Sequence, residues 1–144
     1  MGRVIVHLDC KPKDNAISSI VEDFQDRLRP RGISLQTHES KKSRESYESE
    51  ISNLSGTLVL LDERGESMSS IELAEWLNST QLTNETTHIA VGPHQGFSEQ
   101  TKQSSDSMIS LSRFTLTHEF SAVLLMEQLF RATEINRGGA YHRV

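Results

Sequence analysis

The sequence predicts an α/β fold in which helices flank a mainly parallel sheet. Two observations support this prediction: short apolar runs of strand length recur along the 144-residue chain, and segments with helical periodicity separate them. Strands and helices that alternate in this way form strand–helix–strand units, whose strands pair in parallel. The length suits one hydrophobic core, so we expect residues 1–144 to form a single domain.

The first elements are two strands with a helix between them. Residues 3–8 are a β-branched apolar run, and residues 33–38 alternate apolar and polar side chains, as a half-exposed strand does. Between these runs, apolar side chains recur three and four residues apart on one helical face: Ile17, Ile20, Val21, Phe24 and Leu28. Pro30 and Gly32 end this helix. The charged, serine-rich segment 39–50 is expected to be a loop that leads into a short surface helix.

The later elements supply three more strands and two helices. Residues 57–61 are apolar without alternation, which is typical of a central strand covered on both faces. The Ser-x-x-Glu pattern of residues 69–72 is a capping box and predicts the start of a helix. Residues 88–91 and 109–111 are two further short strands. A longer helix over residues 120–135 then runs to a pair of glycines that ends it.

The composition indicates a globular protein of the cytoplasm. Hydrophobic residues make up 35% of the chain and charged residues 24%, which is a globular rather than a disordered composition. A single cysteine, Cys10, excludes an internal disulfide and suits a reducing compartment. Since every apolar run is too short for a signal peptide or a membrane span, we expect a cytoplasmic protein without a membrane segment.

The net charge limits which nucleic-acid contacts are plausible. A charge of −5 argues against broad, sequence-blind binding to nucleic acid, although a local basic site remains compatible with it. Three arginines, Arg131, Arg137 and Arg143, follow one another near the end of the chain against a single acid, Glu134. Any contact with RNA is therefore expected to concentrate there.

Ligands of parallel sheets bind beyond the carboxyl ends of the strands. This rule places a pocket at the loops that follow Leu61, Val91 and Leu111. The turn from Gly92 to Gly96 permits close approach of its backbone to a ligand, but it lacks the lysine of a phosphate-binding loop and the spacing of a dinucleotide site. Residues 61–65 could equally be an ordinary polar turn. The pattern thus locates a pocket without identifying its ligand.

Histidines and the C-terminal residues are the remaining chemical candidates. His88, His94 and His118 are expected near the pocket, but their spacing matches no zinc template, so we expect no metal site. The chain ends in Tyr141-His142-Arg143-Val144. A frayed basic end and a functional tail are both compatible with this composition.

Taken together, five ordered motifs resemble the RlmH family of ribosomal RNA methyltransferases, which belong to the SPOUT class. In that family they are a Leu-Asp-x-x-Gly turn, a glycine-rich turn, a serine- and threonine-containing loop that ends in Pro-His, a Glu-Gln-x-Tyr-Arg-Ala helix core and a terminal Tyr-His-Arg/Lys. The matching segments here are 61–65, 92–96, 110–118, 127–132 and 141–143. The resemblance runs from about residue 58 to the end, and the N-terminal third agrees in element order more than in letters.

The resemblance implies a SPOUT fold with a C-terminal trefoil knot, with the knot and cofactor site within about residues 57–144. It also implies a homodimer with the long C-terminal helix in its interface. S-adenosylmethionine is the implied cofactor, bent in the knot and held largely by backbone atoms. Its implied contacts are Leu61, Gly92, Pro93, Ser112, Arg113, Phe114, Thr115, Leu116 and Thr117.

The reaction implied by the resemblance is methylation of N3 of a pseudouridine in large-subunit (23S) ribosomal RNA on assembled ribosomes. Transfer requires an aligned nucleophile and removal of the N3 proton, for which a base of near-neutral pKa is suited. From residue type and the family's terminal motif, His142 is the candidate base. Arg143 is expected to steer phosphate or stabilise the deprotonated ring, and Tyr141 to position the tail.

Three positions depart from the family pattern. Pro93 stands where a second glycine is expected, Thr117 replaces a proline, and Ala122 replaces an arginine that would face RNA or the partner subunit. These departures leave a second hypothesis open, a catalytically weakened SPOUT-fold protein that binds the ribosome without transferring methyl groups. A third, a flavodoxin-like nucleotide binder, would require the terminal motif to be accidental.

Overall fold

A computed structural model describes residues 2–39 and 43–143, and within them five strands form one sheet. The strands are β1 (Val4–Leu8), β2 (Ile33–Thr37), β3 (Thr57–Ser67), β4 (Thr87–Ala90) and β5 (Ser107–Ser110). Their spatial order is β2-β1-β4-β3-β5, and all four pairings are parallel. The predicted α/β class and parallel sheet are therefore confirmed.

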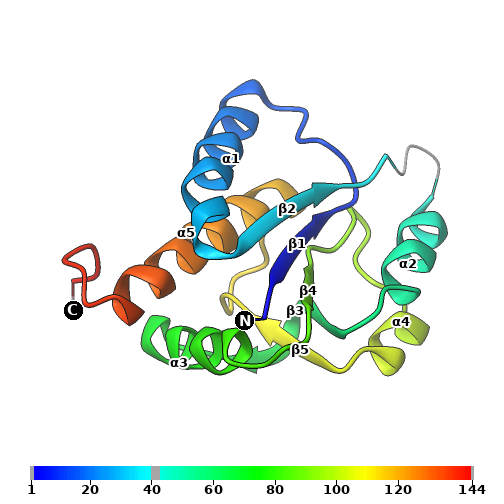
Figure 1. Cartoon of the computed structure of the whole chain (residues 1–144). Helices are drawn as coiled ribbons and strands as arrows, with labels where there is room; N and C mark the ends of the chain where they lie inside the picture. Colours follow the sequence, from blue (N-terminus) through cyan, green and yellow to red (C-terminus); the bar gives the residue numbers. More distant parts are fainter. Residues whose placement is uncertain (1, 40–42, 144) are drawn as a thin grey trace.

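Helices cover both faces of this sheet (Figure 1). They are α1 (Asn15–Leu28), the short 3₁₀ helix η1 (Arg29–Arg31), α2 (Arg44–Ser52), α3 (Ser70–Gln81), α4 (Glu99–Ser104) and α5 (His118–Asn136). α1, α3 and α5 lie on one side of the sheet, and α2 and α4 lie on the other. Among the described residues, no helix is long and apolar enough to cross a membrane.

Local signals in the sequence explain where the helices begin. The Asp14 carboxylate accepts hydrogen bonds from the backbone N–H groups of Ala16 and Ile17, which caps α1. Ser69 and Glu72 form the predicted capping box at the start of α3, with reciprocal bonds of 3.1 and 2.9 Å. Each bond satisfies an N–H group that the first helical turn leaves without an intrahelical partner.

Burial on both faces produces two apolar clusters. The larger lies between the sheet and α1, α3 and α5, and its residues include Val6, Val21, Leu77, Val59 and Leu129. The smaller lies under α2 and α4 and consists of Tyr47, Ile51, Leu58, Leu60, Ala90 and Phe97. Consecutive residues of β3 therefore belong to different clusters, which explains why residues 57–61 are apolar without alternation.

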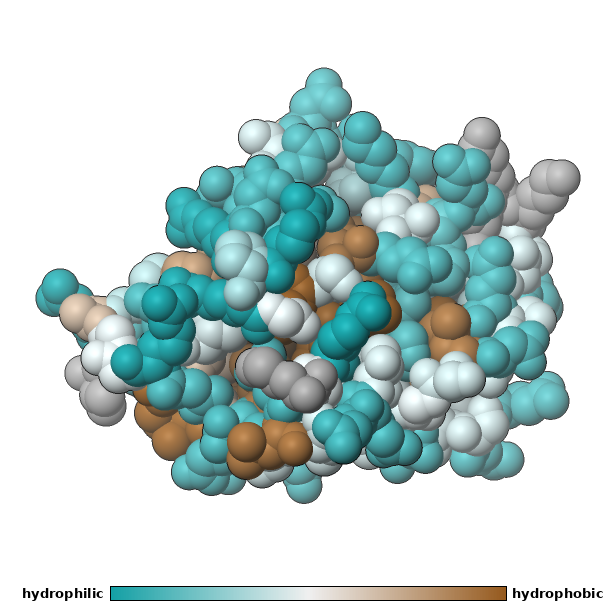
Figure 2. Space-filling view, in the orientation of Figure 1, coloured by the Kyte–Doolittle hydropathy of each residue, from teal (hydrophilic) through white to brown (hydrophobic). Residues whose placement is uncertain are grey.

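The outer face drawn in Figure 2 is largely hydrophilic, with apolar atoms gathered over α3 at the lower left. Ile71 in this helix is 43% exposed, and Leu82 directly after it is 77% exposed. Exposed apolar side chains in these numbers are ordinary on a soluble surface.

Two elements differ from the prediction. β3 continues to Ser67 because residues beyond Leu61 pair again with β5 after an irregularity between Leu61 and Glu66. The segment 61–65 is thus a bulge within a strand rather than a turn after it. α4 has six mostly polar residues and no apolar periodicity that could reveal it. The trefoil knot stays a prediction, since strand order does not describe how the chain threads.

Candidate functional site

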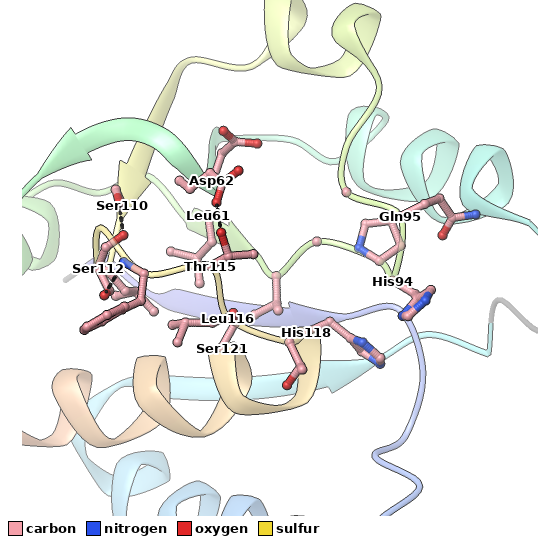
Figure 3. Close-up of a pocket in the computed structure, with 18 residues that line it drawn as sticks. Leu61, Asp62, His94, Gln95, Ser110, Ser112, Thr115, Leu116, His118 and Ser121 are labelled. Atoms are coloured by element: carbon pink, nitrogen blue, oxygen red, sulfur yellow. Dashed lines mark hydrogen bonds between the residues drawn. The ribbon is translucent and has the colours of Figure 1, made fainter.

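A cavity of about 480 Å³ lies at the carboxyl ends of β3, β4 and β5, where the sequence places the pocket. Figure 3 shows the loops that follow these strands converging on it. Besides residues already proposed as cofactor contacts, the lining includes Asp62, Glu63, Val91, His94, Gln95, Gly96, Ser110, Leu111, His118 and Ser121. The lining therefore combines backbone-rich turns with hydroxyls and a few apolar side chains.

An aromatic side chain of α2, Tyr47, holds the loop after β4. The hydroxyl of Tyr47, which is fully buried on α2, donates to the carbonyl oxygen of Val91 at 2.7 Å. Within the turn, the N–H of Gly96 donates to the carbonyl of Pro93 at 2.8 Å, and Gly96 adopts a φ of +80° that favours glycine. Phe97 packs beneath Gly92, where a Cβ would meet its ring at 3.4 Å. These contacts define the shape of the turn.

The loop between β5 and α5 is shaped by short polar contacts. The Ser110 hydroxyl donates to the carbonyl of Ser112 at 2.9 Å, and the Ser112 hydroxyl accepts from the N–H of Phe114 at 2.9 Å. Thr115 donates to the carboxylate of Glu63 at 3.1 Å, which ties this loop to the bulge of β3. The local hydrogen bonds of Ser and Thr thus build the turn that the cavity needs.

The bulge of β3 is anchored by an ion pair. The carboxylate of Asp62 pairs with the ammonium of Lys102 on α4 at 3.2 Å, and both side chains are mostly buried. The same carboxylate accepts from the backbone N–H of Arg64 at 2.9 Å. Asp62 therefore fixes the bulge against α4 at the rim of the cavity.

Two imidazoles lie together at one side of the cavity (Figure 3). The rings of His94 and His118 contact edge to face, with centroids 5.7 Å apart. His88, by contrast, is absent from the cavity lining, so the expectation that it lies near the pocket is wrong. Among the described residues, no group of three or more His, Cys, Asp or Glu side chains could hold a metal ion.

The structure brings nearly all the expected cofactor contacts to this cavity. Leu61, Gly92, Pro93, Ser112 and the stretch from Phe114 to Thr117 all line it. Arg113 is exposed and does not belong to the lining. Whether these residues contact a cofactor stays a prediction, because lining a cavity is a statement about position.

The terminal residues lie elsewhere, folded back onto the C-terminal half of α5. The Tyr141 hydroxyl donates to the carboxylate of Glu127 at 2.7 Å, and the Tyr141 ring meets Phe130 edge to face at 5.0 Å. Burial and the bond to Glu127 raise the pKa of Tyr141. The guanidinium of Arg131 donates to Nδ1 of His142 at 3.1 Å. In this arrangement Nδ1 of His142 is occupied as an acceptor.

The tail and the cavity lie at different parts of α5. His118 lines the cavity at the first residue of the helix, whereas Tyr141 contacts Glu127 and His142 contacts Arg131, nine and thirteen residues further along. At a rise of 1.5 Å per residue, these contacts lie roughly 14 and 20 Å along the helix axis from His118. Figure 1 shows the end of the chain beside the last turns of α5. The candidate base His142 therefore does not reach the cavity of its own chain in this arrangement.

The three departures from the family pattern have different structural consequences. Pro93 lines the cavity and supplies the carbonyl that closes the glycine turn. Thr117 caps α5, because its hydroxyl accepts from the N–H of Phe120 at 3.2 Å. Ala122 is 2% exposed within the larger core, so the interpretation of this position as facing RNA or a partner is wrong for the described chain.

Sequence reasoning missed a buried polar group on the other side of β1 and β4. His7, His38 and His88 contact one another through their ring nitrogens, and Tyr47 packs beside them. No motif reveals this arrangement, since residues 31 and 81 positions apart meet only through strand pairing. The one available signal was a histidine within an otherwise apolar strand.

Comparison with known proteins gives a consistent result. Residues 3–142 match the model of a family described as predicted SPOUT methyltransferases. A protein of Citrifermentans bemidjiense is 35% identical over 92% of this chain and 93% of its own length. A protein of Geobacter sp. (strain M21) is 46% identical over 60% of this chain, and one of Maridesulfovibrio salexigens is 40% identical over 62%. All three are named ribosomal RNA large subunit methyltransferase H.

The extent of these matches differs. The matched segments span 57% and 58% of the Geobacter and Maridesulfovibrio proteins. A solved structure from Legionella pneumophila, described as a methyltransferase with its cofactor SAM bound, has a TM-score of 0.45 and 11% identity. It covers 90% of this chain and 66% of that one, and a likeness at this level carries no weight for the present chain.

Proposed function

The chain belongs to the SPOUT methyltransferase family, and on this premise we propose that it methylates N3 of a pseudouridine in large-subunit (23S) ribosomal RNA on assembled ribosomes. S-adenosylmethionine is the proposed methyl donor, and the cytoplasm is the proposed location. The relative that matches over nearly its whole length carries the name of a large-subunit rRNA methyltransferase. The observation that carries the proposal is the cavity built by the three motif-bearing segments at the ends of β3, β4 and β5.

The residues that line the cavity fit this cofactor. A volume of about 480 Å³ lies within the range of small-molecule sites. The turn at Gly92 presents backbone to the cavity. Leu61 and Leu116 offer apolar surface for a flat base, and Ser112 and Thr115 offer polar atoms. These residues, with Pro93, Phe114 and Thr117, would hold S-adenosylmethionine, which supplies a methyl group activated on a sulfonium.

The tail supplies the proposed acid–base chemistry. We assign removal of the N3 proton to His142, with Arg143 opposite phosphate or the deprotonated ring, and positioning of the tail to Tyr141. Because Arg131 occupies Nδ1 of His142 when the tail is folded back, the base is masked until the tail leaves α5. Detachment also breaks the bond between Tyr141 and Glu127. Binding of RNA would therefore have to replace both contacts.

The separation of tail and cavity favours a homodimer. Phe114 in the loop before α5 and Phe120 in its first turn are 81% and 60% exposed, so a partner could cover apolar surface here. An interface along α5 would cover them and bring the tail of one protomer toward the cavity of the other. The proposed dimer thus places two complete sites between the subunits.

Electrostatics favours an assembled ribosome over free RNA as the substrate. The net charge of −5 does not attract RNA in general, and Arg131 is already paired with Glu127 at 3.0 Å. Arg137 and Arg143 are exposed near the C-terminus and are available for phosphate. Since two exposed arginines near the C-terminus supply little attraction for RNA, shape recognition by a composite ribosomal surface would have to supply the remaining affinity.

Methyl transfer to ribosomes tests the function directly. The substrate is ribosomes that lack this modification, incubated with the protein and S-adenosylmethionine labelled in the methyl group. We expect label in large-subunit rRNA with assembled ribosomes and none with free rRNA or separate subunits. Deletion of residues 141–144 should lower the rate at least about 100-fold, because proton transfer by a positioned group contributes that much.

The control is substitution of Arg64 by Gln, which removes an exposed cation on the bulge of β3 without changing the cavity lining. It should keep the rate within a few-fold of the parent. If a folded, cofactor-binding protein labels none of the substrates, the methyltransferase proposal is wrong, and retention on ribosomes would then indicate a binding protein.

A mixing experiment tests whether the site is shared between subunits. One variant lacks residues 141–144, and the other carries Gly92→Val, which crowds the cavity turn against Phe97. Each alone should be inactive. Unfolding and refolding them together should restore methyl transfer, since mixed dimers hold one intact tail opposite one intact cavity. Mixed dimers can be isolated with a different affinity tag on each subunit. If these dimers remain inactive, each tail serves the cavity of its own chain.

A further inference from the structure

Three buried histidines form a continuous hydrogen-bonded chain through the sheet. Nδ1 of His7 on β1 lies 2.8 Å from Nε2 of His38, which directly follows β2. Nε2 of His7 lies 2.8 Å from Nδ1 of His88 on β4. The three residues are 0%, 7% and 5% exposed. This group lies outside the cavity lining and takes no part in the proposed chemistry.

Both ends of the chain meet hydrogen-bond acceptors. At one end, Nδ1 of His38 lies 2.7 Å from the carboxylate of Glu50 on α2. At the other end, Nε2 of His88 lies 2.9 Å from the backbone carbonyl of Ser55. A carbonyl and a carboxylate accept but do not donate. Each terminal nitrogen must therefore carry a hydrogen.

Counting hydrogens shows that neutral rings cannot make all four contacts. Each contact needs one N–H, and a neutral imidazole carries one, so three neutral rings supply three of the four required. While Glu50 is ionised, one ring must therefore be an imidazolium, or else one of the contacts is a repulsion between two lone pairs. A buried repulsive contact of this kind is costly.

We propose that the His38–His7–His88 chain is a proton-binding site that takes up one proton when α2 docks against the sheet. The proton belongs on His38, because that ring alone faces a carboxylate. All bonds then run in one direction, from His38 through His7 and His88 to Ser55, while the second N–H of His38 donates to Glu50. Burial and the neighbouring histidines lower the pKa of His7 from 6.5 to about 3, which keeps the central ring neutral.

The surroundings add further titratable groups. On α2, Tyr47 stacks edge-on against His38, and Glu48 accepts two hydrogen bonds from Ser98 at 2.7 and 2.8 Å. Burial raises the pKa of Tyr47 well above its usual value, and Asp9, Cys10 and Glu50 raise it further. The carboxylates on this side favour a cation in the chain, as does the accepting role of Glu50.

Loss of the proton should loosen α2. The Glu50 side chain is 51% exposed, whereas His7 and His88 are enclosed, so the contact that gives way is the one between His38 and Glu50. Tyr47 belongs to the same helix and holds the carbonyl of Val91. The 91–97 turn should consequently be well ordered when the histidine chain carries its proton and less ordered when the proton is lost. Any effect on cofactor binding rests on the proposed function.

Glu50→Gln distinguishes the effect of the extra proton on the histidine chain from the effect of the hydrogen bond between residue 50 and His38. A glutamine amide can donate to Nδ1 of His38 and thereby supply the fourth hydrogen, so three neutral rings then suffice. Glu50→Ala supplies none. The matched control is Glu45→Gln, which removes the same charge from an exposed position of the same helix.

Two measurements test the proposal without any cofactor: nitrogen NMR of labelled imidazoles, and amide hydrogen exchange of residues 44–52 and 91–97 between pH 5 and 9, corrected for intrinsic rates. We expect one doubly protonated ring in the chain at pH 6, and protection of both segments that falls roughly tenfold as that ring is neutralised. Glu50→Gln should show three neutral rings and a protection that is independent of pH, whereas Glu50→Ala should be loose throughout and Glu45→Gln should follow the parent.

Three neutral rings in the parent at pH 6 would overturn the proposal, as would a Glu50→Gln variant that behaves like Glu50→Ala. Neither readout requires methyl transfer or a bound ligand. A failure here is thus distinguishable from a failure of the proposed function, which is tested by label transferred to ribosomes.

Discussion

Gly65→Ala is expected to cost about 3 kcal/mol of unfolding free energy, at the upper end of what overpacking in a core costs. A Cβ at this position would lie 2.6 Å from the carbonyl carbon of Met108 and 2.7 Å from backbone atoms of Ile109. Because the neighbours are main chain of the paired strand β5, no rotamer change can relieve the clash. Relief requires β3 and β5 to separate.

Separation of these strands would also move the floor of the cavity. Ser110, the residue after Ile109, lines the cavity and orients the loop that follows. Urea unfolding at pH 7 measures the stability, and calorimetric titration with S-adenosylmethionine measures the cofactor affinity at a temperature where the variant is folded. Both should fall.

Glu66→Ala is the matched control, since Glu66 is the exposed neighbour on the same strand. Its unfolding free energy should stay within about 0.5 kcal/mol of the parent, as is usual for surface positions. A Gly65→Ala protein as stable as this control would show that the backbone of β5 leaves room for a Cβ at position 65.

The sequence was a good guide wherever a local rule decides the structure. Apolar runs predicted each of the five strands, and the Ser69–Glu72 pattern predicted the start of α3. The cavity followed from a rule about the ends of parallel strands, which needs the order of elements and no contact between particular side chains. Gly65 was included in a motif. The reason for a glycine at this position, its close contact with the backbone of β5, is visible only in three dimensions.

Other features depend on contacts between distant parts of the chain and could not be predicted. α4 is too short and polar for periodicity, and it is held in place by Asp62 and Glu48 from other elements. The position of the tail on α5 depends on Glu127 and Arg131, which the motif identifies by letter without indicating what they touch. The histidine chain combines residues of three strands or their ends.

The central histidine of this chain is expected to make the protein sensitive to acid. The pKa of His7 falls from 6.5 to about 3 in the folded protein, chiefly because of burial and secondarily because of the electrostatic influence of the neighbouring His38 and His88. An unfolded chain takes up a proton on this ring as the pH falls through 6.5, whereas the folded chain does so only near pH 3. Between these values the unfolded state binds more protons, so acidification lowers the free energy of unfolding.

The expected loss is roughly 5 kcal/mol, complete near pH 3 and absent above pH 6.5, at about 1.4 kcal/mol for each unit of pKa difference. Carboxylates contribute to acid unfolding as well, so the parent alone is not decisive. His7→Gln keeps one donor and one acceptor at the same place but cannot titrate. Its unfolding free energy should be lower at pH 7 and should decline less steeply between pH 6.5 and 4.

Urea unfolding at half-unit steps of pH measures these slopes for the parent, for His7→Gln and for His94→Gln, which removes an exposed histidine at the cavity rim. The parent and His94→Gln should share one slope. If His7→Gln has the same slope as well, His7 is protonated in the folded protein at the same pH as in the unfolded one. The interpretation of His7 as a buried, neutral ring between two histidines would then be wrong. A shallower slope in His7→Gln alone would establish that folding excludes a proton from the central ring of the histidine chain. The extra proton must then lie at the end of the histidine chain that faces Glu50.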